Sequence, residues 1–85
     1  MKKYFVTGGC GFIGSNFIRY LLTQYDRIKV INLDKLTYAG NPKNLSDFEN
    51  DERYIFYHGD ICDSKIVKEI FQRYKPDFLI NFAAE

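Results

Sequence analysis

The chain has 85 residues, with twelve Lys and Arg against eleven Asp and Glu and a formal net charge of +1. A chain of this length allows one small domain at most, and the near-neutral charge gives no reason to expect a nucleic-acid partner. No apolar stretch approaches the ~20 residues of a membrane span, so we expect a cytoplasmic protein that binds neither nucleic acid nor membrane.

The first predicted strand is followed directly by a glycine-rich turn. Residues 3–7 form a short apolar run typical of a buried parallel strand. The next segment is Gly9-Cys10-Gly11-Phe12-Ile13-Gly14, in which the glycines permit a tight turn and let the backbone approach a pyrophosphate. From Phe12 to about Tyr25, apolar residues recur at helical spacing. The pattern predicts a helix whose N-terminal N–H groups point at the phosphates of a dinucleotide.

The second predicted strand covers residues 29–33 and ends at Asp34, twenty positions after Gly14. A carboxylate at this place can accept hydrogen bonds from the ribose of an adenosine. It would also repel a 2′-phosphate, which favours NAD over NADP as the cofactor. Lys35 weakens this preference slightly, because a cation can tolerate the phosphate.

The connection over residues 35–53 is longer than most loops of compact domains, and loops of that length tend to be functional or disordered. Apolar residues such as Leu45 and Phe48 distinguish it from a low-complexity linker. Asn41-Pro42 is typical of a helix start, so we expect a short helix over about residues 42–48.

The third predicted strand covers residues 54–57 and is closed by His58-Gly59-Asp60. At this place in a dinucleotide-binding fold, the Asp60 carboxylate can accept from the exocyclic amine of adenine, and Ile61 can pack on the ring. No serine and acid are arranged for catalysis near His58, so we expect this histidine to have a structural role at the strand end.

A second helix is predicted from Asp63, its N-cap, with apolar residues at helical spacing over residues 66–74. Pro76 ends this helix, because a residue that precedes a proline disfavours helical conformation. Residues 78–82 form a fourth apolar strand. Strands without polar alternation are typically buried on both faces, as in a parallel sheet covered by helices.

The alternation of strands and helices predicts an α/β fold, a Rossmann-like parallel sheet with strand order 3-2-1-4 and flanking helices. Ligands of such folds bind at the carboxyl ends of the strands, where the strand order reverses. We expect the glycine turn, Asp34, Asp60 and Ala83-Ala84-Glu85 to converge at that edge.

We expect no catalytic residue and no metal site in this chain. A catalytic tyrosine would need a lysine four residues on to lower its pKa, and we interpret the tyrosines as residues of the core or of the crevice rim. Two cysteines are too few for a zinc site or a disulfide scaffold. Cys10 and Cys62 are both expected to be buried, small apolar residues.

The most specific pattern in the chain begins in the second strand. Asn32-Leu33-Asp34-Lys35-Leu36-Thr37-Tyr38-Ala39-Gly40-Asn41 resembles the dTDP-glucose 4,6-dehydratase family of extended short-chain dehydrogenases/reductases. Gly59-Asp60-Ile61-Cys62-Asp63 and Asn81-Phe82-Ala83-Ala84-Glu85 are similar to the same family, and Thr7 to Gly14 resembles its glycine fingerprint. The resemblance covers the whole chain.

The resemblance implies NAD as the cofactor and a set of NAD contacts along the strand ends. These positions are Gly8, Gly11, Phe12, Ile13, Gly14, Asp34, Lys35, Leu36, Thr37, Asp60, Ile61, Phe82, Ala83, Ala84 and Glu85. The family usually has a smaller residue where this chain has Cys10, a difference that should not impair the turn.

The resemblance also implies an activity for a full-length enzyme. Its substrate dTDP-glucose is oxidised at C4, loses water across C5 and C6, and regains the hydride at C6 to give the 4-keto-6-deoxy sugar. Family members are several times longer than this chain and commonly form homodimers. Residues 1–85 are therefore expected to be the N-terminal part of an NAD-binding Rossmann domain, with the family's catalytic Tyr-x-x-x-Lys pair and substrate region beyond Glu85.

Two alternatives remain. One is another extended short-chain enzyme, either a UDP-sugar 4-epimerase or a GDP-mannose dehydratase, and the run from Leu36 to Asn41 argues against it. The other is a nucleotide-binding fragment without turnover, which we expect the 85 residues to be when they are alone.

Overall fold

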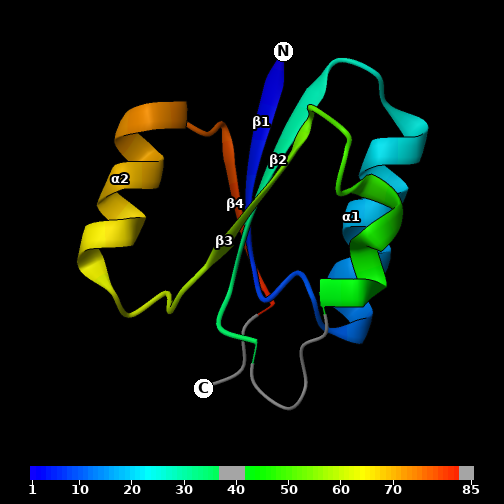
Figure 1. Cartoon of the computed structure of the whole chain (residues 1–85). Helices are drawn as coiled ribbons and strands as arrows, with labels where there is room; N and C mark the ends of the chain where they lie inside the picture. Colours follow the sequence, from blue (N-terminus) through cyan, green and yellow to red (C-terminus); the bar gives the residue numbers. More distant parts are fainter. Residues whose placement is uncertain (37–41, 83–85) are drawn as a thin grey trace.

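The computed structural model describes residues 1–36 and 42–82 of the chain. Its elements follow one another in the order predicted from the sequence (Figure 1). They are β1 (Lys2–Thr7), α1 (Phe12–Gln24), β2 (Ile28–Asp34), the 3₁₀ helix η1 (Pro42–Phe48), β3 (Tyr54–His58), α2 (Ser64–Tyr74) and β4 (Phe78–Asn81). Within these two ranges, no helix is long and apolar enough to cross a membrane.

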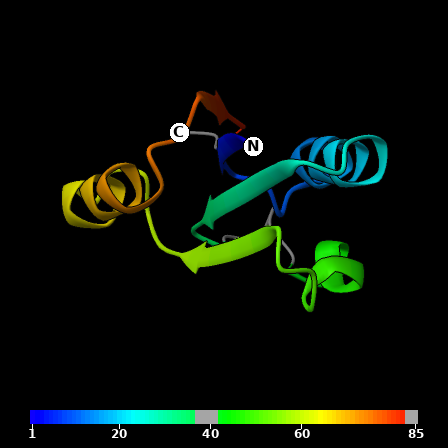
Figure 2. The same ribbon diagram turned by 90° about the horizontal axis from the view of Figure 1, so that it is seen from above.

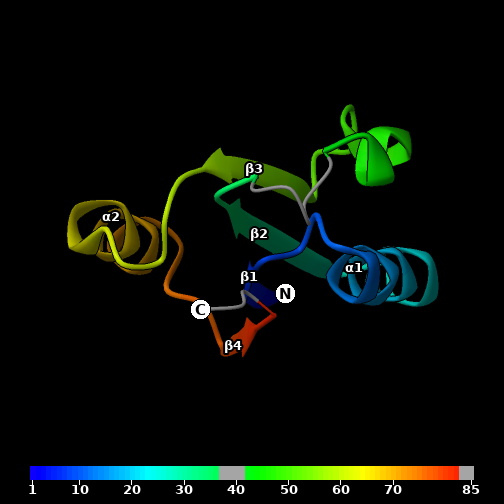
Figure 3. The ribbon, with the colours of Figure 1, turned by 90° about the horizontal axis from the view of Figure 1, so that it is seen from below.

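The strands form one parallel sheet in the order β3-β2-β1-β4, which confirms the predicted fold class. Figures 2 and 3 show α1 and η1 on one face of this sheet and α2 on the other. Neighbouring residues of β1 point to opposite faces, so Phe5 belongs to the core beneath α2 and Val6 to the core beneath α1. The apolar run of β1 thus fills two cores, which explains its lack of polar alternation.

Burial of the sheet is less even than the sequence predicts. β2 is buried along nearly its whole length, whereas Phe78 and Leu79 of β4 are 45% and 53% exposed. The expectation that the fourth strand is buried on both faces is therefore wrong. The physical reason is that β4 is an outermost strand. Among the described residues it pairs with β1 alone, so its other side has no neighbouring strand.

The carboxyl ends of all four strands lie together at one end of the sheet. In the register, Thr7 lies opposite Leu33 on one side and Asn81 on the other, and Asp34 lies opposite His58. The segments that follow β1, β2, β3 and β4 therefore leave the sheet close to one another. This convergence was predicted, and the structure confirms it for the residues that it describes.

The boundaries of α2 and η1 follow local signals in the sequence. The Asp63 side chain caps α2 by accepting a hydrogen bond from the Lys65 N–H at 3.0 Å. Lys75 takes a left-handed conformation, with φ of 49°, and ends α2 directly before Pro76. η1 covers the range expected for a short helix but is kinked at Leu45, whose side chain enters the core beneath α1.

The C-terminus of α1 is held by an arginine from the end of the long connection. Arg53 donates from Nη2 to the Leu22 carbonyl at 3.0 Å and from Nη1 to the Tyr25 carbonyl at 2.7 Å. Asp51 fixes the guanidinium through both carboxylate oxygens, at 3.1 Å from Nε and 2.8 Å from Nη2. Because α1 has no basic residue in its own last turn, Arg53 supplies the cation that the negative end of a helix favours.

We expect Arg53→Met to lower the free energy of unfolding by about 1–2 kcal/mol, because two helix carbonyls lose a donor and Asp51 loses its partner. Urea unfolding of the complete gene product, followed by circular dichroism, measures this change. Arg27→Met removes an exposed arginine close to the same helix end and should cost less than about 0.5 kcal/mol. Equal losses in the two variants would contradict the capping role of Arg53.

The same ion pair should make stability depend on pH. The hydrogen bond from the Arg53 side chain holds the pKa of Asp51 below its ordinary value of 3.8. A carboxyl group with a lowered folded-state pKa contributes stability that is present above the unfolded pKa and is lost as the pH falls through the folded one. We therefore expect the wild type to lose more thermal stability than Asp51→Asn between about pH 5 and about pH 3. Parallel melting curves for the two proteins across this range would disprove the linkage.

Candidate functional site

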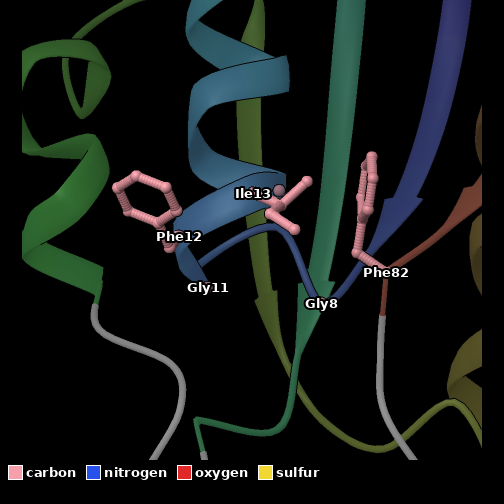
Figure 4. A pocket seen from close by; sticks show the side chains of 6 residues that line it. Gly8, Gly11, Phe12, Ile13 and Phe82 are labelled. Carbon is pink, nitrogen blue, oxygen red and sulfur yellow. The ribbon is translucent and has the colours of Figure 1, made fainter.

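A pocket of about 330 Å³ opens where β1 passes into α1, and Gly8, Gly11, Phe12, Ile13, Gly14 and Phe82 line it. In Figure 4, the side chains of Ile13 and Phe82 flank the loop between Gly8 and Gly11, and Phe12 projects from the start of α1. Phe12 and Ile13 are 80% and 69% exposed, although both are apolar. The structure thus brings together six of the predicted site residues around an open pocket.

Glycine is required at two positions of this turn. Gly8 has a φ of 73°, in the left-handed region that residues with a side chain rarely adopt. A Cβ at Gly14 would lie 2.5 Å from the Gly8 carbonyl oxygen and 2.8 Å from the Gly9 Cα. The first turn of α1 therefore packs directly on the backbone of the loop, at a separation that no side chain allows.

Side chains from β2 and η1 hold the peptide groups of the turn. The Gly9 N–H donates to Asn32 Oδ1 at 3.0 Å, and the Cys10 N–H donates to Asp34 Oδ2 at 2.7 Å. On the other side, Asn44 Nδ2 donates to the Cys10 carbonyl oxygen at 2.8 Å. These contacts fix the orientation of the loop.

Asn32 and Asn44 were missed by sequence reasoning. Asn32 had a signal that could have found it, namely a polar residue inside an apolar strand, since buried polar groups need partners. The Asn32 amide has three partners. Its Oδ1 accepts from the Gly9 N–H, and its Nδ2 donates to the Tyr54 hydroxyl at 3.0 Å and to the Cys10 sulfur at 3.5 Å. Asn44 had no such signal, because it lies in a short polar segment far from the turn in sequence.

The start of α1 offers N–H groups without helical acceptors. Gly11 is the N-cap, no side chain caps the helix, and the Ser15 N–H donates to the Gly11 carbonyl at 2.9 Å. The N–H groups of Phe12, Ile13 and Gly14 precede this bond and have no acceptor within the helix. Together with the helix dipole they favour an anion at this end.

Asp34 lies beside the turn, at the end of β2, and is only 7% exposed. Its Oδ2 accepts from the Cys10 N–H, and its Oδ1 accepts from the Leu36 N–H at 2.8 Å. A carboxylate has about four lone-pair sites, so both oxygens can still accept from a hydroxyl group. The predicted ribose acceptor and the predicted pyrophosphate turn are therefore in direct contact.

Lys35 and Asp60 form an ion pair between the ends of β2 and β3, with Nζ and Oδ2 3.2 Å apart. The backbone N–H of Cys62 and then Lys35 hold the pKa of Asp60 below its usual range. His58 Nε2 lies 3.2 Å from the Lys35 carbonyl oxygen, in keeping with a structural role at the strand end. Ile61 packs against the core beneath α2.

The remaining predicted contacts are less fully described. The Phe82 N–H donates to the Thr7 carbonyl at 2.7 Å, and the Phe82 ring lies 5.4 Å from that of Phe17. Thr37, Ala83, Ala84 and Glu85 lie outside the described residues. Their predicted contacts with NAD stay predictions, as do those of the other residues of the set.

One tyrosine of the chain has a lysine four residues on, which is the spacing that a catalytic tyrosine would need. Tyr25 is the C-cap of α1, whereas Lys29 lies in β2, near its amino end, opposite Lys3. Both residues lie near the amino ends of the strands, at the end of the sheet opposite the glycine turn. This spacing therefore forms no catalytic pair at the pocket. No three His, Cys, Asp or Glu side chains in the described ranges are grouped to hold a metal ion.

The two cysteines differ in their surroundings. Cys10 is fully buried, and this burial, followed by the charge of Asp34, raises the pKa of its thiol to about 11. Cys62 is exposed, which contradicts the expectation that both are buried. The reason is position, because Cys62 directly precedes the Asp63 cap, at the surface between β3 and α2.

We expect iodoacetamide at about pH 8 to modify Cys62 readily and Cys10 hardly at all in the native protein, because only an accessible thiolate reacts. Mass spectrometry of tryptic peptides measures the two rates. Unfolding in urea should abolish the difference, which serves as the control. Modification of native Cys10 at the rate of Cys62 would show that the turn opens to solvent.

The chain is similar to known proteins and solved structures. A family model described as GDP-mannose 4,6 dehydratase matches residues 5–85. A dTDP-glucose 4,6-dehydratase of Escherichia coli is 51% identical over 98% of this chain and 23% of its own length. The crystal structure of a dTDP-glucose 4,6-dehydratase from Bacillus anthracis in complex with NAD is 39% identical, with a TM-score of 0.97 over 100% of this chain and 27% of that one. A UDP-glucose 4-epimerase from Thermotoga maritima is 31% identical, with a TM-score of 0.82 over 98% of this chain and 24% of that one.

The chain spans about a quarter of the length of the curated relatives that it matches. These matches confirm the resemblance to the dTDP-glucose 4,6-dehydratases that the sequence motifs indicate, and the match at residues 5–85 covers nearly all of the chain. The chain belongs to the GDP-mannose 4,6 dehydratase family.

Proposed function

We propose that this chain is the NAD-binding part of a dTDP-glucose 4,6-dehydratase. The observation that carries the proposal is the 2.7 Å hydrogen bond from the Cys10 N–H to the Asp34 carboxylate. It joins the turn suited to a pyrophosphate to the acceptor suited to a ribose, in the arrangement that a dinucleotide needs. The identity of 51% with a dTDP-glucose 4,6-dehydratase supports the assignment of the substrate.

The residues present fit NAD. The first turn of α1 packs against the backbone of Gly8 and Gly9, so the uncapped helix start lies directly beside the turn and offers N–H groups to a pyrophosphate. Asp34 would accept from the ribose hydroxyls, and Asp60 and Ile61 would face the adenine. Because Lys35 pairs with Asp60, its charge is partly neutralised and the carboxylate of Asp34 dominates the choice of NAD over NADP.

The predicted contacts of Thr37, Phe82 and the segment 83–85 complete the proposed cofactor site. NAD, when bound, supplies a hydride acceptor for the oxidation at C4 and a hydride donor for the reduction at C6. The role that we propose for this chain is to hold the cofactor, and the described residues that line the pocket are glycines and apolar residues. We assign residues 1–85 to the N-terminal part of a Rossmann domain and propose a cytoplasmic homodimer as the complete form.

The rival activities share this cofactor site, so it does not separate them. A UDP-sugar 4-epimerase needs no loss of water, and a GDP-mannose dehydratase acts on a different nucleotide. Sequence identity favours the dTDP-glucose 4,6-dehydratase. It is 51% with the Escherichia coli enzyme and 39% with the Bacillus anthracis structure, against 31% with the Thermotoga maritima epimerase.

The test is an assay of the complete gene product with dTDP-glucose, GDP-mannose and UDP-glucose in separate reactions. We expect NMR to show the 4-keto-6-deoxy sugar with dTDP-glucose and no comparable turnover of the other two. Turnover of another sugar nucleotide alone would refute the substrate assignment. The 85-residue chain, assayed in parallel, is expected to show no turnover, and product from it would refute the view that it is only the cofactor-binding part.

A further inference from the structure

η1 reaches the glycine turn through one side chain. Asn44 donates from Nδ2 to the Cys10 carbonyl at 2.8 Å, across 34 positions of sequence. Cys10 is fully buried, so water cannot readily replace this donor. Loss of the Asn44 amide would therefore leave a buried acceptor without a partner or force the peptide group to rotate.

Asn44 is in turn held by α1. Arg19 donates from Nη2 to the Asn44 carbonyl at 2.6 Å and from Nη1 to the Asp47 carboxylate at 2.7 Å. The same guanidinium lies over the Phe48 ring, 5.4 Å from its centroid. One side chain of α1 thus fixes η1 at three points, which places Asn44 against the turn.

The peptide group that Asn44 holds is the last before the helix. It joins Cys10 to Gly11, and Gly11 is the N-cap of α1. The Cys10 N–H donates to Asp34 and the Gly11 N–H donates to the Gly8 carbonyl at 3.4 Å, so Asn44 adds a further restraint, on the carbonyl of this peptide group. Rotation of this peptide group would change the direction in which the first N–H groups of α1 point.

We propose that Asn44 is a positioning residue for pyrophosphate binding, supported by Arg19. The inference rests on the proposed function and deepens it, because it makes η1 part of the cofactor site. Asn44 acts through the Cys10–Gly11 peptide group rather than on the cofactor itself. Its effect therefore falls on ligands that contain the pyrophosphate.

The experiment compares NAD, ADP and adenosine by isothermal titration to the complete gene product, freed of nucleotide. We expect Asn44→Ala to weaken NAD and ADP binding about tenfold and adenosine binding less than about twofold, because adenosine has no phosphate. Arg19→Met should act in the same direction with a smaller effect. Asn50→Ala, which truncates an exposed asparagine just after η1, should leave all three dissociation constants unchanged.

Unchanged NAD and ADP affinities in Asn44→Ala would overturn the inference, and so would an equal loss for all three ligands, which marks general damage. If Asn44→Ala does not fold, Asn44→Ser is measured in its place under the same criteria. Failure of the wild type to bind NAD refutes the proposed function instead, so the two failures are distinct.

Discussion

Gly14→Ala is expected to weaken NAD binding by about 2–3 kcal/mol, roughly a hundredfold in Kd, because several N–H groups lose their alignment at once. The new Cβ would meet the Gly8 carbonyl oxygen at 2.5 Å and the Gly9 Cα at 2.8 Å. Both are backbone atoms that cannot rotate away, so α1 and the turn must separate. Overpacking of this kind also costs about 1–3 kcal/mol of stability.

The control for this variant is Gly59→Ala. A Cβ at Gly59 would meet Ile66 Cδ1 at 2.8 Å and Leu33 Cδ1 at 3.2 Å, which are the ends of flexible side chains. We expect a stability change below about 1 kcal/mol for Gly59→Ala, because these ends can repack. Titration of NAD and thermal unfolding test both variants. Wild-type affinity for NAD in Gly14→Ala would contradict the requirement for close packing of α1 on the turn.

Asp34→Ala should weaken NAD binding by roughly 1–3 kcal/mol, as expected for lost hydrogen bonds to a charged group. The structure adds a second consequence, because the N–H groups of Cys10 and Leu36 lose their acceptor. Because Cys10 is buried, we also expect the free energy of unfolding to fall, by ~1–3 kcal/mol. Binding and stability should therefore decline together in this variant.

Two comparisons separate these effects. Asp26→Ala removes an exposed carboxylate near the other edge of the sheet and should change neither quantity appreciably. Asp34→Asn removes the charge that repels a 2′-phosphate, so the ratio of the NADP to the NAD dissociation constant should fall. An unchanged Kd for NAD in Asp34→Ala would exclude the ribose role.

The fold could be predicted because its signals are local. The apolar runs, the glycine turn and Pro76 each limit the backbone within a few residues, and the observed boundaries lie within one residue or so of those expected. β4 was misjudged in burial because its place at the sheet edge depends on which strands pair, and composition alone does not show this. Cys62 was misjudged for a similar reason, since exposure between two elements depends on how they pack.

The site could be predicted only in part. The glycines and Asp34 stand at a characteristic spacing, which reflects the length of one strand–helix–strand unit. Asn32 and Asn44 act across 23 and 34 positions, and no local pattern encodes such hydrogen bonds. Lys35 was considered against a 2′-phosphate and as an NAD contact, whereas its ion-pair partner in the structure is Asp60, just beyond the end of β3.

The central position of β1 in the sheet affects how the protein folds during translation. β1 is synthesised first, yet its two neighbours are β2 and β4, and the latter follows more than seventy residues later. Parallel pairing across such separations is slow, because loop-closure entropy opposes contacts between distant segments. One edge of β1 therefore stays open during translation, until residue 81 has emerged. An open edge can pair with another nascent chain, so the demand for chaperones should be greatest in that interval.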